Sequence, residues 1–324
     1  MQKYLICMPR GGFNDTLCQI EKCWAYAERW NRKLYIDPEL SGLFGFLWDL
    51  FEEQPIKTPN RKNLLVKERS EVLDIAPEGT LLRELLLAHH AHSTKEFAND
   101  DTGRHQKSQR EYWQRQSFDF FKDHDDQFLL HMSYGGGTES RGFINRVRLR
   151  DDVAELIEAR LAQLPEDYVS VHVRCTDMKS NYKHFIASLK ESLTGKNALV
   201  CSDNQLVVDY AKSALTGTQV HTTESERSKT GKAIHGEMRR IGVGKSTRYG
   251  AMLDLITDLV ALGGGAEIHV APTYPHLRGN TLSKAVKKAR RAIGFDRTVH
   301  VSGFSELAQY LTENKDVLAR FMGR

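Results

Sequence analysis

The chain has 324 residues, which is enough for two domains, and its 40% hydrophobic and 27% charged residues are typical of a soluble globular protein. A net charge of +4 suits an anionic small-molecule substrate but lacks the concentrated basic stripe of a nucleic-acid-binding protein, so no nucleic-acid partner is expected. No apolar run has the length of a membrane span, so we expect no transmembrane segment, while peripheral contact with a membrane stays open.

The N-terminus and the cysteines indicate the compartment. The apolar part of the first twelve residues is too short for a secretory signal. Five cysteines are an odd number, and most lie in apolar strand or helix patterns, as expected of buried reduced thiols. We therefore predict a cytoplasmic protein. Cys18 and Cys23 lack the CxxC spacing of a zinc site.

The first half of the chain opens with a βαβ pattern. A strand over 3–8, a helix over about 15–30 and a second strand over 34–36 favour a parallel sheet. The aromatic-rich stretch 41–51 is typical of a core segment. The chain then turns polar over about 81–126, and we interpret part of this stretch as a loop over a substrate cleft.

The second half alternates strands and helices more regularly. A glycine-rich stretch at 134–138 marks the approach to a domain boundary, which we place after residue 145. The strands expected beyond it are 168–173, 197–201, a short one at Val220, 267–271 and 298–301, and the helices are 148–163, 182–193, one ending at Ala214, 247–263, 279–292 and 304–315. We predict an α/β fold with a less regular domain over 1–145 and a Rossmann-like domain over 146–324.

The stretch Val-His-Val-Arg-Cys-Thr-Asp, residues 171–177, is the most informative in the chain. It ends a buried strand and delivers His172, Arg174 and Asp177 to its carboxyl end. In open α/β sheets that edge binds ligands. An arginine fork suits a phosphate, because it donates parallel charge-assisted hydrogen bonds. The alternative is a structural Arg–Asp pair at a strand end.

Two further carboxylates have both a functional and a structural interpretation. Asp203 follows the strand 197–201, so it either lines the same cleft as His172 and Arg174 or caps the next helix. Asp254 lies among apolar residues of the helix 247–263 and needs a partner. A guanine offers its N1–H and N2–H groups to such a carboxylate. An ion pair with Arg248 or another basic group is the alternative.

Two loops are candidate contacts for a nucleotide sugar. Thr273 follows the strand 267–271 and precedes an expected helix, a setting that suits a diphosphate. Gly12 and Asn14 lie between the first strand and its helix, although the G-x-G-x-x-G spacing is absent. We expect that loop to contact the nucleotide sugar or the acceptor. Asn14 and Asp15 are also good helix caps.

Two other motifs are discounted. Gly244-Lys245-Ser246 has part of a P-loop, but Arg239 occupies the position of its first glycine. Asp123-His124-Asp125 has the Asp-x-Asp form of metal-dependent sugar transferases, but it lies in a charged stretch that no apolar strand precedes. We interpret it as a solvated charge cluster and predict no metal site.

The chain resembles the α1,6-/α1,2-/protein O-fucosyltransferase superfamily, and among its members the bacterial nodulation-type α1,6 enzymes most closely. The resemblance covers the first forty residues and most of 165–290. His-Val-Arg-Cys-Thr-Asp resembles the first family motif, Val-Cys-Ser-Asp-Asn the second, and Tyr-Gly-Ala-Met-Leu-Asp-Leu-Ile-Thr-Asp-Leu the third. It implies a GT-B fold, with two Rossmann-like domains facing a cleft, no cofactor or obligatory metal, and GDP-fucose as donor substrate in the second domain.

The resemblance also implies roles for individual residues. Arg174 holds the β-phosphate and stabilises the departing GDP, His172 contacts the nucleoside, and Asp254 binds guanine. Thr273 supplies a hydrogen bond to phosphate where the family usually has serine. The reaction implied is an inverting single displacement in which a base removes the proton of the acceptor hydroxyl. Asp177 is the first candidate for that base, and Asp15 is the second.

The pattern departs from the family at three positions, one of which is the lysine expected after Asp177, where Met178 and then Lys179 stand. Cys175 stands in place of the second arginine of the first motif, and Tyr182 stands where many α1,6 enzymes carry a carboxylate. Our leading prediction is a cytoplasmic fucosyltransferase of bacterial glycan biosynthesis that acts on an oligosaccharide or glycolipid. The alternatives are a sulfo- or phosphoryl transferase that uses the N-terminal glycine loop, and an inactive nucleotide-sugar- or glycan-binding protein.

Overall fold

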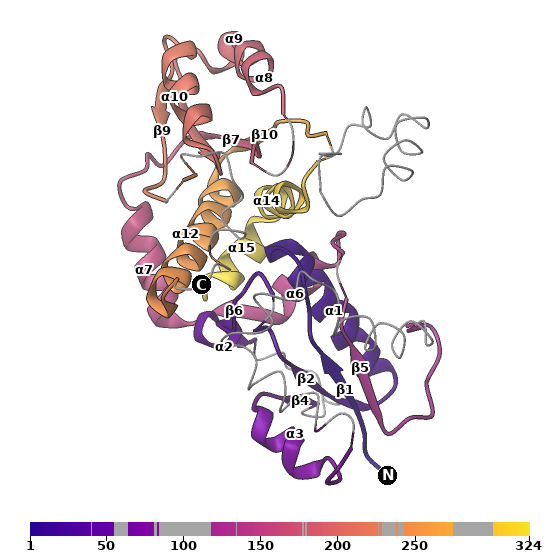
Figure 1. Ribbon diagram of the computed structural model, residues 1–324. Helices are drawn as coiled ribbons and strands as arrows, with labels where there is room; N and C mark the ends of the chain where they lie inside the picture. Colours follow the sequence, from indigo (N-terminus) through magenta and orange to yellow (C-terminus); the bar gives the residue numbers. More distant parts are fainter. Residues whose placement is uncertain are drawn as a thin grey trace, which may run out of the picture. The chain divides into compact units, whose positions relative to one another are not determined.

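The structure is a computed structural model that describes residues 1–39, 41–54, 64–80, 83, 118–133, 135–176, 178, 180–225, 227, 228, 238, 243–274 and 301–324. It divides into two compact units (Figure 1). Unit 1 is Met1–Val147, with Arg239–Val243 assigned to it, and unit 2 is Arg148–Met238 with Gly244–Arg324. The division therefore falls at Val147, beside the boundary that the sequence suggested after residue 145.

Unit 1 is built on a parallel sheet of four described strands in the order β4-β2-β1-β5. Numbered by their order along the chain within this sheet, these strands follow the order 3-2-1-4, which is that of the first four strands of a doubly wound sheet. The elements of this unit are β1 (Lys3–Cys7), α1 (Phe13–Arg29), β2 (Arg32–Ile36), α2 (Leu47–Leu50), β3 (Phe51–Glu53), β4 (Leu65–Val66), α3 (Arg69–Ile75), β5 (Phe128–His131) and α6 (Ser140–Arg146), and β6 (Val147–Leu149) contains the boundary between the units.

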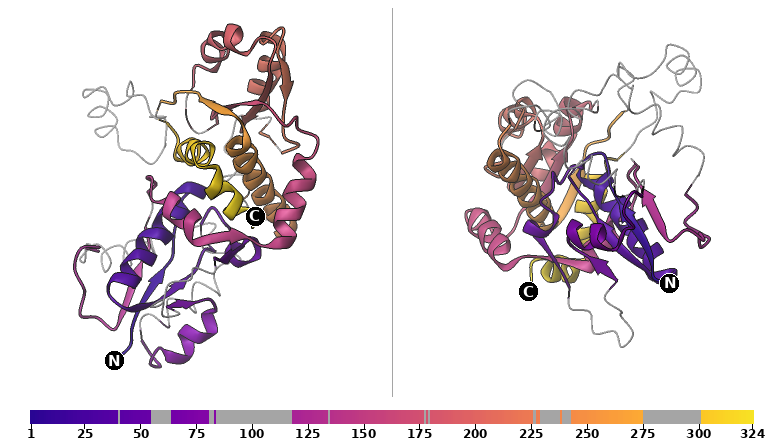
Figure 2. Two further views of the ribbon diagram at one scale, coloured as in Figure 1. Left: turned by 180° about the vertical axis from the view of Figure 1, so that it is seen from behind. Right: turned by 60° about the horizontal axis from the view of Figure 1, so that its bottom comes forward.

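Helix α1 buries one apolar face. Leu17, Ile20 and Ala27 are fully buried, and the helix lies against β1, β2 and α6 (Figure 2). It begins at Phe13, two residues earlier than expected. The Gly12 N–H group, which has no partner within the helix, donates to Asp15 Oδ2 at 3.2 Å and so caps this end of the helix.

The segment leading into β5 is held by one buried arginine. Arg32 has no exposed surface, and its guanidinium donates to Asp123 Oδ1 at 2.8 Å, to the Asp126 carbonyl at 2.9 Å and to the His124 carbonyl. Lys3 Nζ lies 2.7 Å from the other oxygen of Asp123. Asp123 and Asp125 are exposed, as expected of a solvated charge cluster, and the Asp123 carboxylate also pairs with the buried guanidinium of Arg32.

Unit 2 has a second parallel sheet, in the order β10-β7-β8-β9, and the chain-order numbering is again 3-2-1-4 when read from β9. Its elements are α7 (Asp151–Leu161), β7 (Val169–Val173), α8 (Tyr182–Ser188), α9 (Lys190–Leu193), β8 (Asn197–Ser202), α10 (Gln205–Ala214), β9 (Gln219–His221), α12 (Lys245–Gly264), β10 (Glu267–Val270), α14 (Gly303–Glu313) and α15 (Lys315–Phe321).

Two helices of unit 2 differ from the prediction, and two further elements are not tested. The helix expected over 182–193 is interrupted at Leu189, which separates α8 from α9. The terminal helix ends at Glu313, and α15 continues the chain from Lys315. The helix expected over 279–292, and all but the last residue of the strand expected over 298–301, lie outside the described residues.

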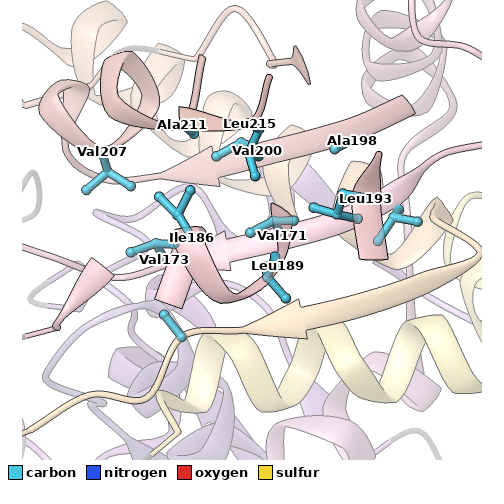
Figure 3. Close-up of a cluster of buried hydrophobic side chains, with 12 residues drawn as sticks. Val171, Val173, Ile186, Leu189, Leu193, Ala198, Val200, Val207, Ala211 and Leu215 are labelled. Atoms are coloured by element: carbon cyan, nitrogen blue, oxygen red, sulfur yellow. The ribbon is translucent and has the colours of Figure 1, made fainter. Parts of the chain in front are cut away.

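Alternation along β7 divides its side chains between two faces of the sheet. Val171 and Val173 point into a cluster made with Ala198 and Val200 of β8 (Figure 3). The cluster also contains Ile186, Leu193, Val207 and Ala211 from the helices, together with Leu189 and Leu215 at helix ends. Ser170 and His172 lie on the opposite face, where Ser170 Oγ donates to the Leu262 carbonyl at 2.9 Å.

Helices α12 and α14 cover this second face and cross closely. A Cβ atom placed on Gly263 would lie 2.8 Å from Leu311 Cβ, so the crossing requires a glycine. Lys315 closes the end of α12, since Nζ donates to the Gly263 carbonyl at 2.6 Å and to the Gly265 carbonyl at 2.5 Å. Among the described helices, none combines the length and the apolar character that crossing a bilayer requires.

Candidate functional site

The strand order of unit 2 identifies where a ligand binds. In a sheet of order 3-2-1-4 the chain leaves the first and fourth strands in opposite directions, which opens a crevice outside their carboxyl ends. Here those strands are β7 and β10. Val270 is the register partner of His172, and the Ala271 N–H group donates to the His172 carbonyl at 2.9 Å. The two segments that the sequence singled out separately, 172–174 and 271–273, thus leave the sheet side by side.

His172 is buried at this edge and is held from α14. Its Nδ1 atom lies 2.7 Å from Ser305 Oγ, and its ring packs on Phe304 at a centroid distance of 5.3 Å. Burial, and then the charge of Arg174, lower the pKa of the imidazole to about 3. The ring is therefore neutral near pH 7, and one of its nitrogens is bound to the hydroxyl of Ser305. Its contact with a nucleoside stays a prediction.

The residues expected to act on phosphate follow the two neighbouring strands β7 and β10. Arg174 is the first residue beyond β7 and is partly buried. Thr273 follows β10 and is 1% exposed. The candidate base Asp177 lies outside the described residues, so the structure does not place it. No group of three His, Cys, Asp or Glu side chains suited to a metal ion occurs within the described ranges.

Asp203 lies at the same edge but binds the protein's own chain. Its Oδ1 atom accepts from the Cys175 N–H group at 2.7 Å, and its Oδ2 atom accepts from Thr176 Oγ1 at 2.5 Å. The helix-cap interpretation of Asp203 is wrong, because Asn204 caps α10 by accepting from the Leu206 N–H group at 3.0 Å.

Asp254 forms an ion pair. Arg160 of α7 donates from Nη1 to Asp254 Oδ1 at 2.8 Å, so the ion-pair interpretation of this carboxylate is confirmed, with Arg160 in place of Arg248. The side chain of Asp254 is 20% exposed. The contact with guanine stays a prediction.

One turn further along α12, Asp258 is a polar residue that the sequence analysis missed. It accepts hydrogen bonds from Thr223 Oγ1 and, at 2.7 Å, from Ser225 Oγ. Burial raises the pKa of its carboxyl group. Its spacing of four residues from Asp254 places both acids on one side of the helix, and that spacing was the signal available in the sequence.

The glycine loop of unit 1 is tied to the loop that follows β5. Asn14 Nδ2 donates to the Gly137 carbonyl at 3.2 Å, and Asn14 Oδ1 accepts from Ser140 Oγ at 2.7 Å. A Cβ atom on Gly136 would lie 2.6 Å from Asp15 Oδ1, so a larger residue there would displace the Asp15 carboxylate. These contacts give Asn14 and Asp15 structural roles. Contact of Gly12 and Asn14 with a nucleotide sugar, and the role of Asp15 as a base, stay predictions.

No family model matches the sequence, and no curated protein matches it either. Solved structures do. The NodZ α-1,6-fucosyltransferase co-crystallised with GDP superimposes with a TM-score of 0.53 at 16% identity, over 96% of this chain and 93% of that chain. The chain has the fold of NodZ. The α/β, GT-B fold expected from the sequence is confirmed.

Two further NodZ structures are similar. NodZ soaked with GDP-fucose gives a TM-score of 0.52 at 17% identity, over 96% of this chain and 93% of that chain. NodZ from Bradyrhizobium gives a TM-score of 0.49 at 17% identity, over 83% of this chain and 87% of that chain. The two superpositions with TM-scores above 0.5 show the fold alone, because their sequence identities are only 16% and 17%.

Proposed function

We propose that this protein is an inverting, metal-independent glycosyltransferase that moves fucose from GDP-fucose to a hydroxyl group of a glycan. One observation carries the proposal: Arg174 and Thr273 leave neighbouring strands at the switch point of unit 2. The chain has the fold of NodZ, whose structures were obtained with GDP and with GDP-fucose. A guanidinium and a hydroxyl at such an edge are the groups that recognise a diphosphate.

In the proposed reaction the acceptor oxygen bonds to C1 of fucose as the bond from C1 to the β-phosphate oxygen breaks. The electron pair of that bond leaves with GDP, and the acceptor proton passes to a base, for which Asp177 is our candidate. Arg174 neutralises the charge that develops on the diphosphate, and Thr273 adds a hydrogen bond. Because the transition state is oxocarbenium-like and the leaving group anionic, this electrostatic stabilisation is the largest contribution.

We assign recognition of the guanine ring to Asp254 and contact with the nucleoside to His172. A neutral imidazole suits that place, because it brings no charge to a nucleoside. The acceptor is proposed to be an oligosaccharide or glycolipid of bacterial glycan biosynthesis, and the enzyme to act in the cytoplasm.

Replacement of Arg174 tests the proposal. R174A should abolish fucose release and transfer from GDP-fucose while leaving the melting temperature close to that of the wild type. R150A is the control, because Arg150 is an exposed arginine of unit 2 that pairs with Asp152. If R174A turns over GDP-fucose as fast as R150A does, the proposed role of Arg174 is wrong.

An inactive GDP-sugar-binding protein is the second candidate. Tyr182 begins α8 where a carboxylate was expected, and its ring packs on Tyr210 at a centroid distance of 5.7 Å. This candidate would be favoured if calorimetry shows that the protein binds GDP but no fucose is released from GDP-fucose with any acceptor tested. Binding of adenosine 3′,5′-bisphosphate in preference to GDP would instead favour a sulfotransferase.

A further inference from the structure

Asp203 accepts hydrogen bonds from the two residues that directly follow Arg174. We infer that Asp203 is a positioning residue, which holds the turn that carries Arg174 and acts on the phosphate through that turn. The inference rests on the proposed function. It replaces the contact with the nucleotide sugar that the sequence suggested for this carboxylate.

The turn is attached to β8 at successive points. Val173, the last residue of β7, is the register partner of Ser202, the last residue of β8. The backbone pairing of β7 and β8 ends at these two residues. Just beyond it, the side chain of Asp203 accepts a hydrogen bond from the Cys175 N–H group. Asn204 Nδ2 lies 3.4 Å from the Cys175 carbonyl, so both polar groups of the Cys175 backbone are bound from β8's own extension. The turn is therefore attached to the end of β8.

The chemistry of the group supports the same role. A carboxylate can only accept hydrogen bonds, so it offers nothing to the oxygens of a phosphate. Both oxygens of Asp203 already have a donor from the turn. Hydrogen bonds to a charged acceptor are about twice as strong as neutral ones, so Asp203 is a strong attachment of the turn that follows Arg174.

Thr176 provides a second way to weaken the attachment. T176V keeps the shape of the side chain and removes the hydroxyl that donates to Asp203 Oδ2, whereas T176S retains a donor. D203A removes both hydrogen bonds. D203N keeps an oxygen for the Cys175 N–H group and offers an amide to the hydroxyl, which can accept in place of donating. D209N is the control, because Asp209 is exposed on the neighbouring α10, where it accepts only from Gln205 among the described contacts.

The test compares the affinity for GDP with that for GMP by calorimetry, beside the melting temperature of each variant. GMP lacks the β-phosphate assigned to Arg174. We expect D203A and T176V to lose GDP affinity by about tenfold, the equivalent of one charged hydrogen bond, with GMP affinity unchanged. T176S, D203N and D209N should stay within about threefold of the wild type. If D203A fails to fold, T176V against T176S gives the same comparison.

The outcomes separate the inference from the proposed function. If R174A loses the preference for GDP over GMP while T176V and D203A keep it, the positioning role of Asp203 is wrong and the function stands. If GDP and GMP affinities fall together in D203A and T176V, the role is purely structural and the inference is again overturned. If the wild type itself binds GDP and GMP equally, the proposed function fails, and the inference fails with it.

Discussion

Arg160 and Asp254 join two helices of unit 2 through a guanidinium–carboxylate contact of 2.8 Å between Nη1 and Oδ1. The pair is partly exposed, with 31% of the arginine and 20% of the aspartate side chain accessible, so it contributes at most about 1 kcal/mol to stability. A role in base recognition would have much larger consequences for ligand binding than for folding.

Substitutions at the two positions should therefore have different effects. We expect D254N to weaken GDP binding by about tenfold or more relative to ADP, because guanine loses the acceptor of its N1–H and N2–H groups. R160M should leave this selectivity intact. Both variants should melt within a few degrees of the wild type. Equal GDP affinities for D254N and R160M would mean that Asp254 serves only the ion pair.

Two glycines of α12 should respond to alanine in opposite ways. At Gly263 the added Cβ would meet Leu311 Cβ at 2.8 Å, and we expect G263A to lower the free energy of unfolding by about 1–3 kcal/mol. At Gly250 no atom lies within 4 Å of the added Cβ, so G250A should raise it by about 0.5–1 kcal/mol through helix propensity. Urea denaturation of the two variants measures both changes, and a gain in stability from G263A would contradict the close crossing of α12 and α14.

The buried His172 should make stability fall in mild acid. Its pKa is lowered from 6.5 to about 3 in the folded protein, so between these values the unfolded chain binds a proton that the folded protein does not. The free energy of unfolding therefore falls as the pH falls below 6.5, and above that pH this group contributes no pH dependence.

The variant H172Q removes this titration. Glutamine can still hydrogen-bond Ser305, whose Oγ lies 2.7 Å from the imidazole. Between about pH 6.5 and about pH 5 the wild type should lose about 2 kcal/mol more than H172Q. Burial also lowers the pKa of His131, to about 4, but that histidine is present in both proteins and its contribution cancels. Parallel pH profiles of the two proteins would show that His172 is protonated in the folded state.

Asp123 pairs with one buried and one partly exposed cation, so the contributions of the two ion pairs to stability can be compared on one carboxylate. Arg32 is fully buried and Lys3 is 30% exposed, and both pair with Asp123. We expect R32M to lower the free energy of unfolding by about 3 kcal/mol, because the backbone carbonyls of His124 and Asp126 lose their donor and Asp123 keeps only Lys3. K3M should cost about 1 kcal/mol or less. Thermal denaturation checks the pair, and equal losses would contradict the dominant role of Arg32.

Much of unit 2 could be predicted because its signals are local. The strands at β7, β8 and β10 and the helices α10 and α12 follow from runs of apolar residues and from their periodicity, and each was placed within two or three residues. In unit 1, β5 and α6 were missed, and the residues just before β5 are bound by the guanidinium of Arg32, about ninety residues away in the chain.

The amino-acid sequence alone determined which side chains arrive at the ends of the strands, because the end of an apolar run is a local property. It placed Arg174, Asp203 and Thr273 each at a carboxyl end. Only the tertiary structure decided which strands are neighbours and which donor each carboxylate receives. Asp254 is bound by a residue 94 positions away and Asp203 by one 27 positions away. A carboxylate bonds to the donor that lies within about 3 Å of it. Which donor that is depends on how the strands and helices of the whole sheet pack.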